Sequence, residues 1–169
     1  MKWTGITGSW RATSEEVERD VRTAVRNIIE RGDGIVTGGA LNVDWFATDE
    51  ALKMNPTATQ IKVCLPVTLE RYAAHYRKRA DEGVITHEQA ERLIEQLTKL
   101  KGANPAALIE HPTNTVVDKT TYFERNSQVV ELSDEMLGFQ VNDSEGVQDT
   151  IDKAREQGNP AEVKKYSIE

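Results

Sequence analysis

One local unit recurs along this chain: a short run rich in β-branched residues, then a glycine turn, then an amphipathic helix. Residues 4–7 are the first run and lead into the segment 8–11, and residues 34–37 are the second and lead into Gly38-Gly39. Residues 61–65 are a third such run. Each intervening helix returns the chain to the start of the next strand, so strands in this arrangement pair in parallel. The repeat therefore predicts an α/β sandwich.

The helices are predicted from apolar stripes at helical spacing. The clearest stripe follows Thr13 and Glu16, which have the spacing of a capping box, and consists of Val17, Val21, Val25, Ile28 and Ile29. Further stripes or capping boxes predict helices that begin near residues 43, 69, 86, 121 and 147. Since helices and strands alternate, we expect a Rossmann-like three-layer sandwich, with a mostly parallel sheet and helices on both faces.

The rest of the chain fits one domain. Residues 136–141 and 163–166 are predicted strands, and residues 102–118 are predicted to be a mostly irregular connection. Residues 68–101 form a helical pair longer than one crossover requires, which indicates a helical insertion. No change of composition marks a second domain, so residues 1–169 are predicted to be a single Rossmann-like domain.

Composition excludes several classes of protein. No apolar run approaches the roughly 20 residues of a membrane span, and the first residues lack the apolar region of a secretory signal, so we expect a cytoplasmic protein without a membrane partner. A single cysteine, Cys64, excludes an intramolecular disulfide and is expected to be buried. The three histidines lack the spacing of metal ligands, so we predict neither a metal site nor a cofactor.

Charge disfavours nucleic acid as a partner. The chain has 21 basic and 28 acidic side chains, for a net charge of −7, and residues 131–152 contain no Lys or Arg. A surface of this sign repels a polyanion. A single strand would have to bind a basic helix that holds four cationic side chains, with Tyr72 and Tyr76 as stacking platforms; the four are Arg71, Arg77, Lys78 and Arg79. The spacing of the two tyrosines also fits a core stripe.

Ligands of open parallel sheets bind beyond the carboxyl ends of the strands, so the loops that follow strands are the candidate sites. In the first loop, Gly8 permits close approach, Ser9 offers a hydroxyl, and Arg11 offers a guanidinium suited to phosphate. In the second loop, Gly38-Gly39 precedes Ala40 and a helix, where backbone amides can bind an anion.

A third candidate region lies in the C-terminal half of the chain. Arg125 and Asn126 stand early in a predicted helix, and Arg125 could hold a phosphate. Glu145, Gly146 and Asp149 follow the strand 136–141, where carboxylates could accept from ribose hydroxyls. Alternatively, Glu145 and Asp149 only favour the positive end of their helix dipole.

Together these segments resemble the SLOG superfamily of Rossmann-like proteins. The resemblance rests on three segments: Ile6-Thr7-Gly8-Ser9-Trp10-Arg11, Ile35 through Asp44 with its Thr-Gly-Gly-Ala turn, and Ile61 through Pro66. They are most similar to the DNA-processing protein A type, and the Arg125-Asn126 and Gly146 segments are similar to LONELY GUY phosphoribohydrolases. The resemblance implies a small-molecule nucleotide-type ligand. The predicted contacts are Gly8, Ser9, Arg11, Gly38, Gly39, Ala40, Asp44, Arg125, Asn126, Glu145 and Gly146.

Two departures from the resemblance shape the functional hypotheses. Thr150 stands where the phosphoribohydrolases carry their catalytic Glu, and Asn42 replaces a glycine of the DNA-processing turn. We therefore predict binding of a nucleotide or nucleotide-derived phosphate. The first alternative is an N-glycosidic hydrolase or transferase acting on nucleoside monophosphates, with Glu145 or Asp149 as the catalytic carboxylate, and the second is single-stranded DNA binding. Whether the protein is an enzyme, or a homo-oligomer, is left open.

Overall fold

The centre of the molecule is a parallel sheet of six strands in the order β4-β3-β2-β1-β5-β6. A computed structural model describes all residues, 1–169. The strands are β1 (Trp3–Gly8), β2 (Gly34–Thr37), β3 (Ile61–Cys64), β4 (Leu108–Ile109), β5 (Glu135–Val141) and β6 (Ala161–Tyr166). Every neighbouring pair is parallel. The predicted Rossmann-like α/β sandwich is confirmed.

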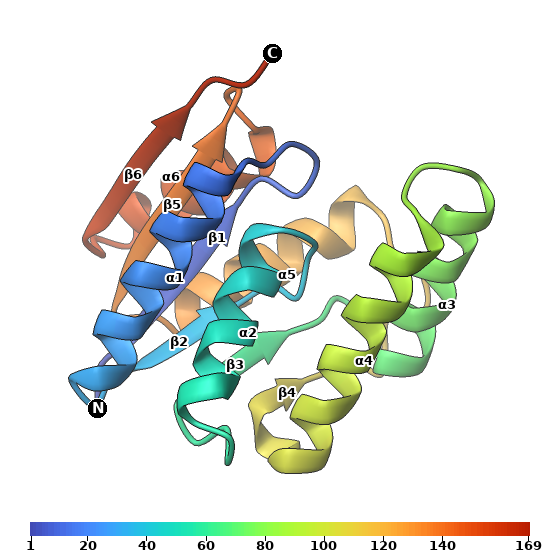
Figure 1. Ribbon diagram of the computed structural model, residues 1–169, viewed down its shortest axis with the longest axis horizontal. Coiled ribbons are helices and arrows are strands. Elements are labelled where there is room, and N and C mark those ends of the chain that lie inside the picture. Colours follow the sequence, from blue (N-terminus) through green and yellow to red (C-terminus); the bar gives the residue numbers. More distant parts are fainter.

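Helices cover both faces of the sheet (Figure 1). Helices α1 (Glu15–Glu30) and α2 (Val43–Met54) pack side by side on one face, and α5 (Lys119–Glu131) and α6 (Glu145–Glu156) pack together on the other. Between β3 and β4 the chain forms α3 (Leu69–Asp81), α4 (His87–Ala103) and a short 3-10 turn, Pro105–Ala107. The crossover from β3 to β4 thus contains a pair of helices where one would suffice.

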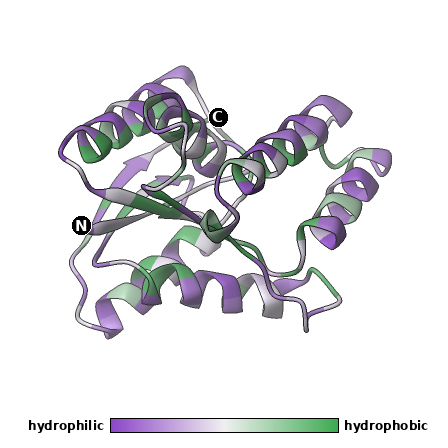
Figure 2. Cartoon of the chain, turned by 90° about the horizontal axis from the view of Figure 1, so that it is seen from below, coloured by the Kyte–Doolittle hydropathy of each residue, from purple (hydrophilic) through white to green (hydrophobic).

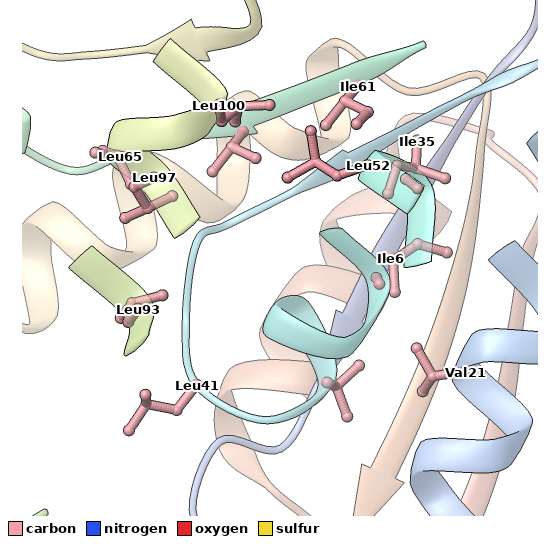
Figure 3. Packing of buried hydrophobic residues seen from close by; sticks show 14 of the residues in the cluster. Ile6, Val21, Ile35, Leu41, Leu52, Ile61, Leu65, Leu93, Leu97 and Leu100 are labelled. Carbon is pink, nitrogen blue, oxygen red and sulfur yellow. The ribbon is translucent and has the colours of Figure 1, made fainter. Parts of the chain in front are cut away.

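The core consists of two apolar layers, one on each face of the sheet. Successive strand residues point to opposite faces, so Ile35 belongs to the larger layer under α1 and α2, whereas Val36 belongs to the smaller one under α5 and α6. Leu93 and Leu97 of α4 are fully buried in the larger layer, and Leu97 lies beside Leu65, the residue after β3 (Figure 3). The helical pair is therefore anchored to the main core. Figure 2 shows the apolar sides of the helices turned toward the sheet.

Two of the predicted helix starts are wrong. Helix α1 is capped by Ser14, whose side chain accepts from the Val17 amide, and not by Thr13. Helix α5 begins at Lys119 after an Asp118 cap, and Thr121 lies in its first turn, where its hydroxyl accepts from the Asp118 amide. Several residues near each start have capping side chains, and backbone geometry selects among them. The predicted capping box at Thr86, with Gln89, is confirmed.

The strand order changes direction at β1, and in open parallel sheets a crevice forms at such a point. The chain adds β2 on one side of β1 and β5 on the other, so the connections that leave β1 and β5 diverge at the carboxyl edge.

None of the helices is both long and apolar enough to cross a membrane.

Candidate functional site

A cavity of about 500 Å³ opens at this carboxyl edge. Its walls come from the loop after β1, the turn after β2, helix α3, the residues 84–85, and the first turns of α5 and α6. Segments up to about 140 positions apart in the sequence thus meet around one space. A volume of this size is typical of small-molecule sites.

Most of the residues predicted to contact a ligand line this cavity. They are Gly8, Arg11, Gly38, Ala40, Asp44, Arg125, Asn126, Glu145 and Gly146. Ser9, Gly39 and Asp149 are not part of its lining. The fold therefore brings the three candidate loops together, and the ligand contacts themselves stay a prediction.

Ser9 and Gly39 make contacts that hold strands and turns of the fold together. The buried Ser9 hydroxyl accepts from the Val141 amide at 2.9 Å, so it ties the end of β1 to the end of β5. Gly39 has a φ of +68°, and a Cβ there would lie 2.7 Å from Leu65 Cδ2. The Tyr72 hydroxyl donates to the Gly39 carbonyl at 2.8 Å. Gly39 therefore faces the core, and its lack of a side chain meets a packing requirement.

Gly38 makes room for Arg125. The buried Arg125 side chain donates from Nη1 to the Gly38 carbonyl and from Nε to Asn126 Oδ1 at 3.2 Å, and its guanidinium lies 5.1 Å from the centre of the Tyr122 ring. A Cβ on Gly38 would be 2.8 Å from Arg125 Nε. Burial lowers the pKa of the guanidinium, but nearby tyrosine hydroxyls and Asp44 more than offset this, so Arg125 remains charged. Its Nη2 group forms no hydrogen bond within the protein.

Asp44 holds the turn between Gly38 and α2. Its Oδ2 atom accepts from the Ala40 amide at 3.1 Å, whereas its Oδ1 atom has no hydrogen-bond partner. The residue is 6% exposed. Burial raises the pKa of this carboxyl group to about 6, against the opposing effects of the Arg125 charge and the amides of Ala40 and Gly38. Asp44 thus combines an unsatisfied acceptor with an unusually high pKa.

The cavity also contains residues that the sequence did not indicate as ligand contacts. His75 and Arg79 line it from α3, and Lys119 and Tyr122 line it from α5. His75 and Arg79 are four positions apart, so they share a helix face, and Tyr122 precedes Arg125 by three positions. Helical spacing thus places each pair on one helix face, but it does not show that this face meets a cavity. Burial and the Arg79 charge lower the pKa of His75.

Arg79 contributes a second unsatisfied atom. One end of its guanidinium pairs with Glu82 at 3.1 Å, but its buried Nε has no partner. Arg79 Nε and Asp44 Oδ1 are the two buried side-chain polar atoms without a hydrogen-bond partner among residues 1–169. Both belong to residues that line this cavity.

The basic helix α3 does not offer the stacking surface considered for DNA. Tyr72 and Tyr76 are buried, at 1% and 7% exposure, and their hydroxyls lie 3.2 Å apart. Arg77 pairs with Glu91 at 2.9 Å, and Arg71 donates to the carbonyls of Pro112 and Asn114. Both tyrosines follow the apolar stripe of α3 into the core, so neither offers its ring on the outer surface of the basic helix, although Tyr76 also lines the cavity.

The two candidate catalytic carboxylates lie in different places. Glu145 lines the cavity at the start of α6. Asp149, one turn later, accepts from Asn126 Nδ2 at 3.2 Å and pairs with Lys153 at 2.9 Å. Thr150 also lines the cavity, but its hydroxyl donates to the Gly146 carbonyl. Asp149 therefore contacts the lining residue Asn126 but does not itself line the cavity.

Solved structures share this fold. DNA processing protein A from Helicobacter pylori, described as binding single-stranded DNA, aligns with a TM-score of 0.70 and 21% identity over 96% of this chain and 64% of that chain. The same protein from Streptococcus pneumoniae aligns with a TM-score of 0.53 and 15% identity over 95% of this chain and 58% of that chain. The molybdenum cofactor carrier protein from Chlamydomonas reinhardtii aligns with a TM-score of 0.50 and 15% identity over 96% of this chain and 76% of that chain.

These likenesses confirm the Rossmann-like α/β fold, and two of them are DNA processing protein A, the type of protein that the sequence segments resemble. The chain spans less than two thirds of the length of the two DNA-processing structures. Neither a protein-family profile nor a curated protein sequence matches the chain.

The expectation that nucleic acid is not a partner, which is based on net charge, is wrong. A protein with this fold is described as binding single-stranded DNA, so nucleic acid is a partner class of proteins with this fold. The net charge of −7 is a sum over the chain, whereas the cavity is lined by the cationic side chains of Arg11, Arg79, Lys119 and Arg125. A ligand responds to the local field, which the total does not describe.

Proposed function

We propose that the cavity binds a nucleotide or a nucleotide-derived phosphate. The observation that carries this proposal is the reversal of charge at the cavity. Four cationic side chains line it, from Arg11, Arg79, Lys119 and Arg125, against two carboxylates, from Asp44 and Glu145. A chain with a net charge of −7 that gathers cations around one crevice provides an electrostatic site for an anion.

The backbone around the cavity supports a phosphate site. Helices α2 and α6 both begin at this edge, and the positive ends of helices favour anions. Gly146, in the first turn of α6, lines the cavity, and a Cβ built on it meets no atom within 4 Å. Arg125 Nη2, which has no partner in the protein, can donate to a phosphate oxygen.

Aromatic side chains support a planar base in addition to the phosphate. Tyr122 and Phe123 line the cavity from α5, and Trp10 lines it from the loop after β1 with 36% of its surface exposed. The Arg11 guanidinium lies 4.8 Å from the centre of a Trp10 ring. Flat rings next to cations are the surroundings that a nucleotide base and its phosphate require.

Calorimetry with AMP, GMP, CMP, UMP and inorganic phosphate tests the proposal. We expect the double variant Arg11→Gln with Lys119→Gln to bind at least about tenfold more weakly, because two phosphate-attracting charges are removed. The matched control is Arg19→Gln with Arg155→Gln, which removes two exposed charges outside the cavity. Equal loss in both variants, or no binding of any probe to the wild type, would refute the proposal.

Single-stranded DNA binding is a second candidate function, favoured by the likeness to the Helicobacter pylori protein. In this chain it would use the same cavity, because the exposed Trp10 ring and the Arg11 and Lys119 charges lie there, whereas the tyrosines of α3 are buried. Fluorescence anisotropy with an oligothymidylate at two salt concentrations, using the same two double variants, tests this candidate. Binding that weakens with salt and is lost only in the cavity variant would support it.

A further inference from the structure

The pattern of unsatisfied polar atoms gives more information about the ligand. Buried polar groups in folded proteins nearly always find hydrogen-bond partners, and exceptions require an explanation. Other buried polar side chains here have partners, among them Thr37, Thr48, Gln96, Asn126, Ser133, Gln140 and Thr150. The two exceptions, Asp44 Oδ1 and Arg79 Nε, both belong to the lining of one cavity. Two residues that line the cavity, Asp44 and Arg79, thus each have one buried polar atom that the protein itself leaves without a partner.

The free atom of Asp44 selects for a donor on the ligand. A carboxylate oxygen accepts hydrogen bonds and repels phosphate, so its partner is a hydroxyl or an amino group. Asp44 lies at the Gly38 to Ala40 turn, and the Arg125 charge is close enough to lower its pKa. This is the part of the cavity where Arg125 and the helix ends favour the phosphate. In a nucleotide the sugar is bonded directly to the phosphate, whereas the base is further away.

We propose that Asp44 accepts a hydrogen bond from a sugar hydroxyl of the ligand, so that the site takes ribonucleotides in preference to nucleotides that lack this hydroxyl. The inference rests on the proposed nucleotide site and specifies its substrate class. Arg79 Nε, on α3, supplies the complementary donor for an oxygen or ring nitrogen of the same ligand. A purely apolar ligand would leave both atoms unsatisfied, at a cost comparable to a lost hydrogen bond for each.

This assignment separates a free ribonucleotide from a DNA strand. An internal nucleotide of DNA has no 2′-hydroxyl, and its 3′-oxygen is esterified, so it offers no sugar hydroxyl to Asp44. A free 5′-ribonucleotide has a hydroxyl at the 2′ position and another at the 3′ position. Sites built to bind a hydroxyl reject ligands that lack it, because a buried polar group is then left without a partner.

The test is calorimetric titration at pH 8 with AMP, 2′-deoxy-AMP, 3′-deoxy-AMP and 2′,3′-dideoxy-AMP. We expect the wild type to bind the dideoxy compound about 10- to 100-fold more weakly than AMP, and one of the two monodeoxy compounds to account for most of the loss. Asp44→Ala removes both carboxylate oxygens, so it should reduce the AMP-to-dideoxy ratio to below about threefold. Asp152→Ala, which removes an exposed carboxylate outside the cavity, is the matched control and should keep the wild-type ratio.

The outcomes separate this inference from the proposed function. If AMP binds and the dideoxy compound binds equally well, the hydroxyl contact is refuted and the nucleotide site stands. If the wild type discriminates but Asp44→Ala discriminates to the same degree, another residue makes the contact and the assignment to Asp44 is wrong. If none of the compounds binds, both proposals fail. The wild-type series decides the hydroxyl contact even if the variant proves unstable.

Discussion

Replacing Asp44 by Asn tests the electrostatics of the cavity without any ligand. Burial raises the pKa of Asp44 from 3.8 to about 6 in the folded protein. Well below pH 4 the carboxyl group is protonated in both states, and its burial carries no ionisation penalty. Between about pH 4 and pH 6 the unfolded chain ionises this group while the folded state still holds it protonated, so the stability that the neutral form provides is lost over this interval.

The magnitude follows from the shift. About two pKa units, at 1.36 kcal/mol for each unit, correspond to roughly 3 kcal/mol of destabilisation by the ionised carboxylate at pH 7 and above. Asn does not titrate, and its side-chain oxygen can still accept from the Ala40 amide. We therefore expect the Asp44→Asn variant to gain about 3 kcal/mol relative to wild type between pH 4 and pH 7.

Urea unfolding followed by circular dichroism at intervals from pH 4 to pH 8 measures this difference. Carboxylates whose pKa values are lowered, such as Asp20 and Glu135, titrate in both proteins and cancel in the comparison. Asp152→Asn is the control and should follow the wild-type curve. A difference between wild type and Asp44→Asn that stays constant from pH 4 to pH 7 would refute the reasoning, because burial would then not penalise the ionised form.

Three further predictions concern single residues. Gly39→Val should lower the free energy of unfolding by about 3 kcal/mol or more, because it places a β-branched residue at positive φ with its Cβ 2.7 Å from Leu65. Gly146→Val should change this free energy by less than about 1 kcal/mol and weaken nucleotide binding. Equal urea midpoints for the two variants would contradict this prediction. Arg125→Lys should cost roughly 1.5–3 kcal/mol in the same assay, since an ammonium group cannot replace the bonds to both Gly38 and Asn126; an unchanged midpoint would show these bonds to be dispensable. The wild type should release no free base from AMP, GMP, CMP or UMP in a chromatographic assay, because Thr150 provides no carboxylate; release that is lost in Glu145→Gln but kept in Asp149→Asn would favour the hydrolase alternative.

Much of the fold could be predicted from the sequence because its signals are local. The stripe from Val17 to Ile29 repeats with the period of a helix, and all five of its apolar residues are buried against the sheet. The short β-branched runs became β1, β2 and β3 for the same reason. The position of the cavity also followed, since parallel strands joined by helices place the loops after β1, β2 and β5 at one edge.

The direction of each loop side chain was decided only by the tertiary structure. Ser9 and Gly39 have the residue types of a ligand loop, yet the pairing of β1 with β5 and the contact with Leu65 turn them toward the framework. His75 and Arg79 lie on a helix whose sequence indicates a charged outer face, and they line the cavity because α3 lies at its edge. Side-chain direction depends on which distant segment packs against the backbone, and that contact is set by the whole fold rather than by neighbouring residues in the chain.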